Sequence, residues 1–475
     1  MIRCFVAALW VIAASCAVTL RAQAAQPSAR PVVIRNVNVI AMTSPEVLRD
    51  RNVVVRDGLI VSLDAGGSLP SDATSVDGRG KYLIPGMCDM HVHLGDESVR
   101  TLQGDAIAPA IERTQGELIV YVRSGVTCVR NMSGSAFHLE LIKQIEAGRI
   151  LGPRTMTTTP IVDGDPPVWP FATKITDPTE ARALVQSFKA QGYDTVKVYN
   201  ALSRDVYFAL AIAAREAGMK LVGHVPFSIG IWGALSVGQY SIEHFRGYDF
   251  NPAMAPGSSS ASNRFAWWQS LKDADLQRLA QATADAGIYN TPTLNLMELA
   301  VDGEARAKLA KRPVLADLPA ATRAAVMNDS AVKLFSSEAL KAMRDSLPVQ
   351  QRLLRYMMED GAPILAGTDT PALGAIAGDA LHRELELIAA ASSNNFYALS
   401  AATTVPARYF NGLGNRPGSI ASAGTIEAGK PADMVLLGAN PLDDISNVRK
   451  IDGVVLRGEW LSSTDLKARL KKVSK

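Results

Sequence analysis

The 475-residue chain is poor in cysteine and in histidine, with four residues of the first kind and six of the second. Its formal net charge is only +3, and two of its positive charges, Arg3 and Arg21, lie in a segment that we expect to be removed. A nearly neutral mature chain gives no reason to expect a nucleic-acid partner. Cys88 and Cys128 then remain, which is too few for a disulfide scaffold, and we expect both to be small buried thiols in apolar strands.

After residue 24 the sequence also lacks any apolar run long enough to span a bilayer. The N-terminus is typical of a secretion signal, because Arg3 precedes an apolar run from Cys4 to Leu20 and Ala22-Gln23-Ala24 offers small residues for cleavage. The run is somewhat short for a membrane anchor. We expect residues 1–24 to be a signal peptide and the mature protein to be periplasmic or secreted. Lipid attachment at Cys16 is the weaker alternative.

Short segments rich in valine and isoleucine lie near both ends of the remaining chain. In the first group, Asp57-Gly58 between two such runs predicts a hairpin. In the second group, Asp433 to Leu437 and Ile451 to Arg457 repeat the pattern. We therefore expect residues 25–82 and 417–475 to form one small composite β domain, a β-sandwich built from both chain ends.

The central region, residues 83–416, alternates strand-like and helix-like segments. Thr195 to Tyr199 is a predicted strand, and Ser203 begins a predicted helix with an apolar stripe. Repeated units of this length predict a parallel sheet with crossover helices. Two stretches, 246–270 and 296–350, break the rhythm and are predicted to be insertions that follow late strands, where they could cover the mouth of an active site.

Four of the six histidines lie where predicted strands end. His91 and His93 follow an apolar run, and residues two apart in a strand point the same way, so both imidazoles could chelate one metal ion. His224 and His244 end two further strands 20 residues apart, about one strand–helix unit. The alternatives are surface histidines for the first pair and satisfied core histidines for the second. Matching positions in successive units favour metal ligands.

Asp369 and Lys197 complete the set of candidate ligands. Asp369 follows the apolar strand Pro363 to Ala366, so its carboxylate is a metal ligand or, alternatively, a helix cap. Lys197 lies among valines in a strand buried on both faces, where a bare ammonium would carry a large desolvation cost. Burial near cations lowers a lysine's pKa, and a neutral amine adds carbon dioxide to become a carbamate that could bridge two metal ions. The alternative is a lysine ion-paired inside the fold.

The order H-x-H, Lys, His, His, Asp over strands one, four, five, six and eight resembles the binuclear amidohydrolase superfamily. The lead-in Pro85 to Asp89 and the return Gly424 to Met434 are also similar to that superfamily. Within it, the chain most resembles the imidazolonepropionase-like and Xaa-Pro dipeptidase-like branch. The resemblance covers nearly the whole mature chain and implies an α/β fold, a (β/α)8 TIM-like barrel carrying the small β-sandwich domain.

The resemblance also implies a centre of two divalent metal ions. Its ligands would be His91, His93 and Asp369 for the more buried ion, His224 and His244 for the more exposed ion, and carboxylated Lys197 between them. Zinc is the first choice for these nitrogen and oxygen donors, and manganese or cobalt would also fit. The implied reaction is hydrolysis of an amide or peptide C–N bond by a metal-bridging hydroxide, with Asp369 as the general base.

Three further residues are candidates for binding a small amide or dipeptide substrate. Tyr199 shares the inward face of Lys197, Trp169 lies in a proline-rich loop, and Arg246 follows His244. The alternatives are that Tyr199 is a core tyrosine and that Arg246 is a solvated loop arginine. A cyclic amide is an alternative substrate, and the sequence leaves open whether the chain forms homo-oligomers.

Two other functions compete with a binuclear hydrolase. A mononuclear deaminase of the same superfamily typically carries a glutamate soon after the histidine of strand five and no bridging lysine. Here Val225 follows His224, and Lys197 is present. A non-catalytic binding or scaffold relative would tend to lose ligands, whereas this chain retains all six.

Overall fold

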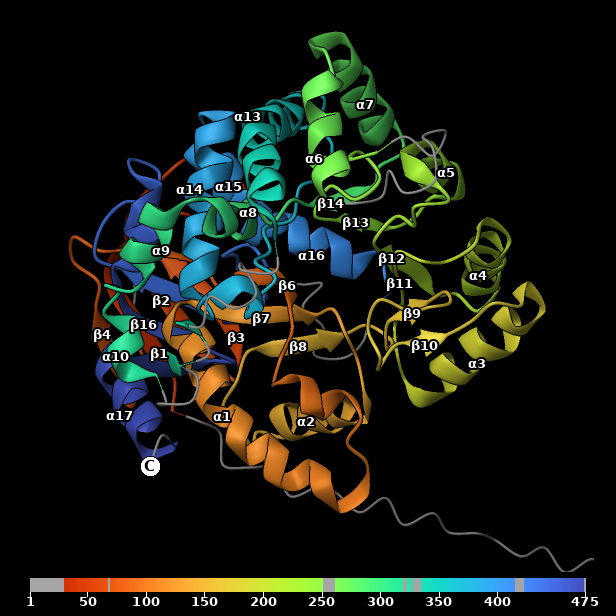
Figure 1. The fold of residues 1–475 in the computed structure, drawn as a ribbon. Helices are drawn as coiled ribbons and strands as arrows, with labels where there is room; N and C mark the ends of the chain where they lie inside the picture. Colours follow the sequence, from red (N-terminus) through yellow and green to blue (C-terminus); the bar gives the residue numbers. More distant parts are fainter. Residues whose placement is uncertain are drawn as a thin grey trace, which may run out of the picture.

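The computed structural model describes residues 30–66, 69–250, 261–318, 323–324, 326–327, 335–414 and 423–473. The predicted signal peptide and parts of both predicted insertions lie outside the described residues. Within the described ranges, no helix combines the length and the hydropathy needed to cross a bilayer. Figure 1 shows a β-rich layer beside a larger region in which strands are surrounded by helices.

Parallel strands form a closed barrel in the central region. The first seven positions are β6 (Met87–Val92), β7 (Val126–Asn131), β8 (Arg154–Thr157) together with β9 (Val162–Asp163), β11 (Thr195–Val198), β12 (Lys220–Gly223), β13 (Ser241–Glu243) and β14 (Tyr289–Thr291). The short strand β10 (Thr173–Lys174) pairs with β9 beside this ring. The ladders run β6-β7-β8 and β10-β9-β11-β12-β13-β14. Thr159 N donates to Thr195 O at 2.9 Å and so joins the two ladders on one side.

Residues 363–366 close the ring on the other side as its eighth strand. Ile364 forms a parallel bridge with Asn290 next to β14. Met90 N donates to Ala366 O at 2.9 Å, which connects the eighth strand back to β6. The predicted (β/α)8 barrel is therefore confirmed, with the strand order one to eight that the candidate ligands require.

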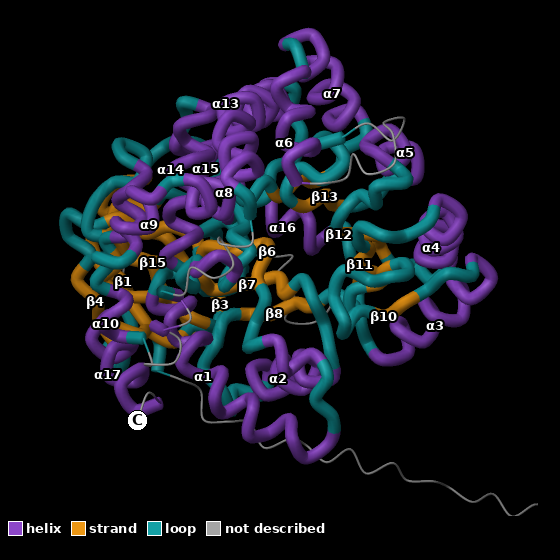
Figure 2. Tube along the Cα trace, in the orientation of Figure 1, coloured by secondary structure: helices purple, strands orange, loops and turns teal. Residues whose placement is uncertain are grey.

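Helices cover the outside of the barrel, as Figure 2 shows. They are α1 (Ile107–Arg123), α2 (Ala136–Glu146), α3 (Ala181–Gln191), α4 (Arg204–Glu216), α5 (Gly230–Val237), α6 (Ala261–Ser270), α7 (Asp273–Asp285), α8 (Leu294–Val301), α9 (Gly303–Leu309), α10 (Val314–Asp317), α13 (Ser337–Glu359), α14 (Asp379–Ser392), α15 (Asn395–Ala402) and α16 (Thr404–Asn411). The start of α4 shows the local cause: the Ser203 hydroxyl accepts from Val206 N and caps the helix. Helices on the outside and side chains on the inside leave strands such as β7 buried throughout.

Strands from both chain ends form one eight-stranded sheet. They are β1 (Val32–Val39), β2 (Leu48–Arg56), β3 (Leu59–Asp64), β4 (Thr74–Asp77), β5 (Tyr82–Pro85), β15 (Met434–Leu437), β16 (Ile451–Leu456) and β17 (Glu459–Ser462). The path runs β17-β16-β15-β5-β1-β2-β3, with β4 beside β1, and β5 pairs antiparallel with β15. The predicted hairpin is confirmed between β2 and β3, where Asp57 and Gly58 have φ of 50° and 77°, as a tight turn of this kind requires. The exact domain boundaries stay a prediction.

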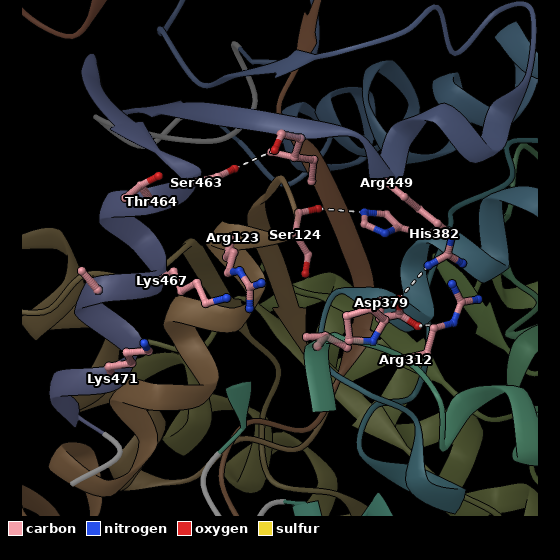
Figure 3. A pocket seen from close by; sticks show the side chains of 14 residues that line it. Arg123, Ser124, Arg312, Asp379, His382, Arg449, Ser463, Thr464, Lys467 and Lys471 are labelled. Carbon is pink, nitrogen blue, oxygen red and sulfur yellow. Dashed lines mark hydrogen bonds and ion pairs between the residues drawn. The ribbon is translucent and has the colours of Figure 1, made fainter. Parts of the chain in front are cut away.

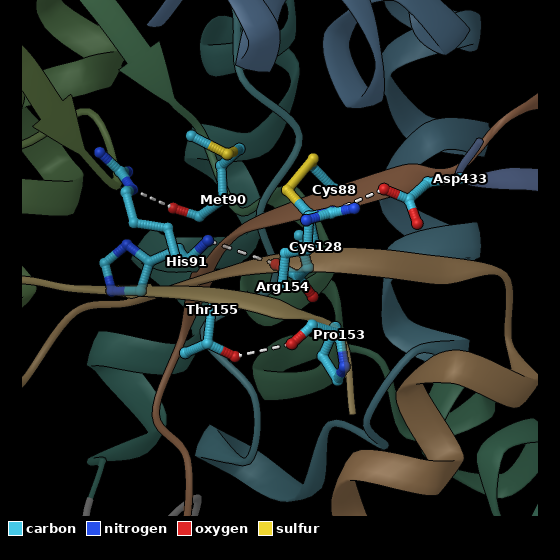
Figure 4. The surroundings of a disulfide bond; sticks show 10 residues. Cys88, Met90, His91, Cys128, Pro153, Arg154, Thr155 and Asp433 are labelled. Carbon is cyan, nitrogen blue, oxygen red and sulfur yellow. Dashed lines mark hydrogen bonds and ion pairs between the residues drawn. A yellow bond between two sulfur atoms is a disulfide. The ribbon is translucent and has the colours of Figure 1, made fainter. Parts of the chain in front are cut away.

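The prediction of two separate thiols is wrong, because Cys88 and Cys128 form a disulfide bond. Figure 4 shows it beside Met90 and His91 on the first barrel strand. The two cysteines are register partners in the parallel pair β6 and β7, and their Cα atoms are 4.5 Å apart. That separation lies within the range a disulfide can bridge. The register that brings them together could not be deduced from the sequence.

Candidate metal centre

The first barrel strand places two imidazoles against one carboxylate. His91 and His93 are two residues apart at the end of β6, and both point towards Asp369 after the eighth strand. Asp369 Oδ1 lies 3.2 Å from His91 Nε2 and 2.9 Å from His93 Nε2. One donor atom from each of these three residues lies within 4.8 Å of the others. The structure therefore brings together the three predicted ligands of the more buried ion, whose role as ligands stays a prediction.

His91 is oriented by a charged partner behind it. Its Nδ1 donates to Glu243 Oε2 at 3.0 Å, and the ring is almost fully buried. A carboxylate acceptor fixes the tautomer with the proton on Nδ1 and leaves the lone pair on Nε2. That Nε2 is a buried nitrogen with no hydrogen-bond partner among the described residues. An orphaned buried acceptor beside a second imidazole and a carboxylate is what a metal ion would satisfy.

A buried ion pair stands behind Glu243. Arg130 in β7 donates from Nη2 to both Glu243 carboxylate oxygens at 2.9 and 2.8 Å, and neither side chain is exposed to solvent. Arg130 also donates to Met90 O, Ser241 Oγ and Tyr409 Oη. Burial opposes ionisation of Glu243, but the charge of Arg130 and the bond from His91 hold its pKa below the ordinary value. The sequence analysis missed this pair, because its two members are 113 residues apart.

His224 and His244 come from the ends of β12 and β13, and neutral groups hold them. His224 Nδ1 lies 2.8 Å from Asn200 Oδ1, and His244 Nδ1 lies 2.7 Å from Thr293 Oγ1. The two ring centroids are 5.1 Å apart, and the His244 ring is 4.5 Å from the His91 ring. With each Nδ1 engaged, each Nε2 is left for the centre. Burial lowers the pKa of both imidazoles well below the ordinary value, which keeps them neutral and able to bind a metal.

Lys197 lies in β11, and its side chain is 1% exposed. Burial lowers its pKa to about 8, against the opposing pull of the Glu243 and Asp369 charges. The charge of Lys197 in turn lowers the pKa of His224 and of His244, as expected for a group close to both rings. An amine with a pKa of about 8 is partly neutral near pH 7, and only the neutral form can add carbon dioxide.

A glycine makes room for the Lys197 side chain. Gly223 ends β12 with a φ of +117°, a conformation that other residues rarely adopt. A Cβ at this position would lie 2.8 Å from Lys197 Cδ and 2.5 Å from Val198 O. The neighbouring strand is thus shaped to let Lys197 extend towards the histidines.

The loop that carries Asp369 is held tightly to the first strand. Asp369 itself has a φ of 59°, and its N–H donates to His91 O at 2.7 Å. Buried Asp89 accepts from Thr368 N at 3.1 Å and from Thr368 Oγ1 at 2.7 Å. A residue in the left-handed region persists only where its surroundings enforce it, and such positions cluster at active sites. The side chain of Asp369 is 15% exposed and that of His93 is 24% exposed, so the centre opens to solvent on one side.

The three candidate substrate residues lie at this rim. Trp169 Nε1 donates to Tyr199 Oη at 3.0 Å, and the Tyr199 ring stacks on His224 with centroids 4.1 Å apart. Arg246 is not the solvated loop residue of the alternative, because its Nη1 donates to buried Asp249 Oδ2 at 2.8 Å. Its side chain is 18% exposed, and its Nε is buried without a hydrogen-bond partner among the described residues. Contact with a substrate stays a prediction for all three.

The donor set fits divalent ions of the zinc, manganese or cobalt type. Imidazole nitrogens and carboxylate oxygens are ligands that these ions accept, and the orphaned His91 Nε2 marks where a ligand bond is lacking. His91, His93 and Asp369 could hold one ion. His224, His244 and a carbamate on Lys197 could supply the ligands of a second.

Comparisons with known proteins identify the family and support the fold. The sequence profile of the Amidohydrolase family matches residues 82–461. The fold is similar to that of a Xaa-Pro dipeptidase with methionine bound in its active site, with a TM-score of 0.65 and 21% identity over 91% of this chain and 100% of that chain. It is also similar to bottromycin amidohydrolase, with a TM-score of 0.68 and 24% identity over 94% of this chain and 91% of that chain. At such identities, these two likenesses establish the fold alone.

One curated relative matches over a short stretch. A dihydroorotase of Trichlorobacter lovleyi is 44% identical over 45 residues, which are 10% of this chain and 11% of the relative. The chain therefore spans about a ninth of the length of this relative, and the alignment does not bear on the activity of the whole protein.

Proposed function

The chain belongs to the amidohydrolase family, and from this premise we propose that it is a metal-dependent hydrolase that cleaves a carbon–nitrogen bond of a small amide or peptide. One observation carries the proposal. His91 Nε2 is buried and has no hydrogen-bond partner in the part of the chain that the structure describes, and it lies beside His93 and Asp369 at the end of the barrel where such folds place their chemistry. The other candidate ligands stand around the same point.

We propose that two divalent ions, zinc by first choice, occupy this centre. Bound there, they would acidify a water molecule and polarise the substrate carbonyl. Lys197 would be carboxylated: its neutral Nζ forms a bond to the carbon of carbon dioxide and releases one proton, which leaves an anionic carbamate. Burial disfavours the ammonium form of Lys197, and two bound cations would stabilise the anionic carbamate.

Asp369 is the proposed general base. Its carboxylate lies at the solvent-open side of the cluster. Burial would raise its pKa, but the surrounding imidazoles of His244, His91 and His93 outweigh burial. The pKa is therefore held well below its usual range, and the group is ionised and able to accept a proton. Asp369 takes a proton as water adds to the carbonyl carbon, and it returns a proton to the amine as the C–N bond breaks.

The substrate that fits the rim carries a carboxylate near the scissile bond. Arg246 offers a guanidinium whose Nε is free, and Tyr199 offers a hydroxyl that already accepts from Trp169 and can still donate. A dipeptide and an N-acyl amino acid each carry a carboxylate next to the scissile amide bond, so we propose these compounds as substrates. Export to the periplasm or medium, with signal-peptide removal, is part of the same proposal.

Replacing Lys197 with alanine tests this function. We expect the purified variant to hold about one ion per chain in place of about two, and to lose activity by at least about 100-fold. Plasma mass spectrometry counts the ions, and a dipeptide and N-acyl amino acid panel reports turnover. Lys220→Ala is the matched control, because Lys220 opens the neighbouring strand β12 with an exposed side chain. Two ions and full turnover in the Lys197 variant would refute the bridging role.

A further inference from the structure

A cavity lies at the other end of the barrel from the candidate metal centre. It encloses about 670 Å³ between the end of α1, the start of α14 and the C-terminal helix α17 (Ser463–Val473). Ser124, in the turn before β7, is part of its lining, and the Ser124 carbonyl accepts from His382 Nε2 at 2.8 Å. The candidate ligands follow the opposite, C-terminal ends of the strands. A strand of six residues such as β7 spans about 20 Å, so this cavity is separate from the metal centre.

Positive charge dominates the cavity lining. The cationic side chains are Arg123, Arg312, Arg449, Lys467 and Lys471, and Asp379 is the one carboxylate among the described lining residues. Helix dipoles account for a cation in the last turn of α1 and of α17. They do not account for Lys467 in the middle of α17 or for Arg312 in the loop between α9 and α10; the remaining cation, Arg449, ends a short 3-10 helix. Like charges four residues apart on α17 also weaken that helix.

The cations form two groups that face each other across the cavity, as Figure 3 shows. Arg123, Lys467 and Lys471 lie on one side, where α1 meets α17. Arg312 and Arg449 lie on the other side, around the start of α14. A ligand that satisfied both groups would need two anionic ends.

The arginine group retains hydrogen-bonding capacity. Arg449 donates from Nη1 to Asp379 Oδ1 at 2.7 Å and from Nε to Glu386 Oε1 at 2.8 Å. Its Nη2 is buried and has no hydrogen-bond partner among the described residues. Arg312 Nε lies 3.7 Å from Asp379 Oδ2, so one carboxylate serves two guanidinium groups. Arg449 Nη2 therefore keeps a donor for a further acceptor, and phosphoryl oxygens are acceptors that arginine binds well.

We propose that this cavity is a second ligand site, which binds a small anion with two linked phosphoryl groups, such as pyrophosphate. One phosphoryl group contacts the arginine side, and the other contacts the lysine side. Thr464, in the first turn of α17, adds a hydroxyl group to the lining, whereas the Ser463 hydroxyl donates to Ile451 O at 2.6 Å. The cations line the walls of a concave pocket and not a flat face, which favours a small soluble anion over a flat anionic membrane.

Calorimetric titration of the full chain with inorganic pyrophosphate tests the proposal, with inorganic phosphate as the probe that has only one group. We expect pyrophosphate to bind at least ten times more tightly than phosphate, and its affinity to fall as salt is added. The double variant K467A/K471A should bind pyrophosphate at least ten times more weakly than the unmodified chain. Its amide hydrolysis without pyrophosphate should be unchanged, because neither lysine lies near the metal centre.

The matched control is K308A/K341A, which removes two exposed helix lysines outside the cavity and should leave pyrophosphate binding intact. Circular dichroism verifies that both double variants are folded. The proposal is overturned if millimolar pyrophosphate produces no binding heat, if phosphate binds equally well, or if K467A/K471A binds like the control. Association with phosphatidylglycerol vesicles without any response to pyrophosphate would also overturn it.

Discussion

The two halves of the candidate metal centre differ in what holds their histidines. Behind His91 stands an ionised carboxylate, Glu243, which is itself locked by the buried guanidinium of Arg130. Behind His224 and His244 stand neutral oxygens of an amide and a hydroxyl. A carboxylate acceptor makes an imidazole a stronger metal ligand than a neutral acceptor does. We therefore expect the inner half to bind an ion more tightly than the outer half, and the outer ion to exchange more easily.

Replacing Asp369 should give the largest loss of activity. This residue contacts His91 and His93 in the inner half of the centre, and it is also the proposed general base. Asp369→Asn keeps the shape and removes the negative charge and the basicity. We expect turnover at saturating metal to fall by about 10² to 10⁴, the usual contribution of a positioned base. Steady-state kinetics with added zinc measures it, and Asp345→Asn, at a partly exposed carboxylate on α13, is the control. If saturating metal restores full turnover, Asp369 is a ligand only, and the proposed base is wrong.

The partners behind the histidines test the comparison directly. Glu243→Gln should lower metal affinity by about 10- to 100-fold, whereas Asn200→Ala should lower it by about tenfold or less. Competition with a fluorescent chelator measures both affinities. Glu243→Gln also leaves Arg130 buried without a counter-charge, so the free energy of unfolding of the metal-free protein should fall by about 3–5 kcal/mol, measured in urea. Equal metal affinities in the two variants would contradict the hypothesis that the carboxylate behind His91 makes the inner half the tighter binding site.

The smallest effect concerns pH in the chelator-treated protein. Burial lowers the pKa of His93 from 6.5 to about 4, so the unfolded chain binds a proton there that the folded chain does not. Stability is then fully present above pH 6.5 and is lost as pH falls towards 4. At pH 5 we expect a loss of about 1–2 kcal/mol from this residue, measured by urea unfolding at pH 5 and pH 7.5. His93→Gln should reduce the pH dependence by that amount, and an unchanged dependence would contradict the assignment.

Local patterns explain why so much of the site could be predicted from the sequence. Two histidines that are two residues apart after an apolar run point to the same side of a strand, as His91 and His93 do. Valines on both sides of a lysine indicate that the lysine side chain is buried, as it is for Lys197. The family profile and the closed ring of strands confirm the resemblance and the fold that these patterns indicated. Each of these signals is contained within a few neighbouring residues.

What could not be predicted depends on register and on distant partners. The Arg130–Glu243 pair joins β7 to β13 across the inside of the barrel, and no local pattern links its members. The disulfide depends on the alignment of β6 with β7, which periodicity alone does not define. The proposed pyrophosphate-binding cavity is lined by cationic side chains that are far apart in the sequence. Each of these side chains resembles an ordinary surface residue in the sequence.

The bond between Cys88 and Cys128 encloses a 40-residue segment that includes the whole of α1. A protease that cut the backbone anywhere between these two cysteines would leave both fragments covalently attached. The strand that carries His91 and His93 could not drift away from its neighbour after such a cut. For a protein exported as proposed, a nicked molecule would keep its first two barrel strands together among the proteases outside the cytoplasm.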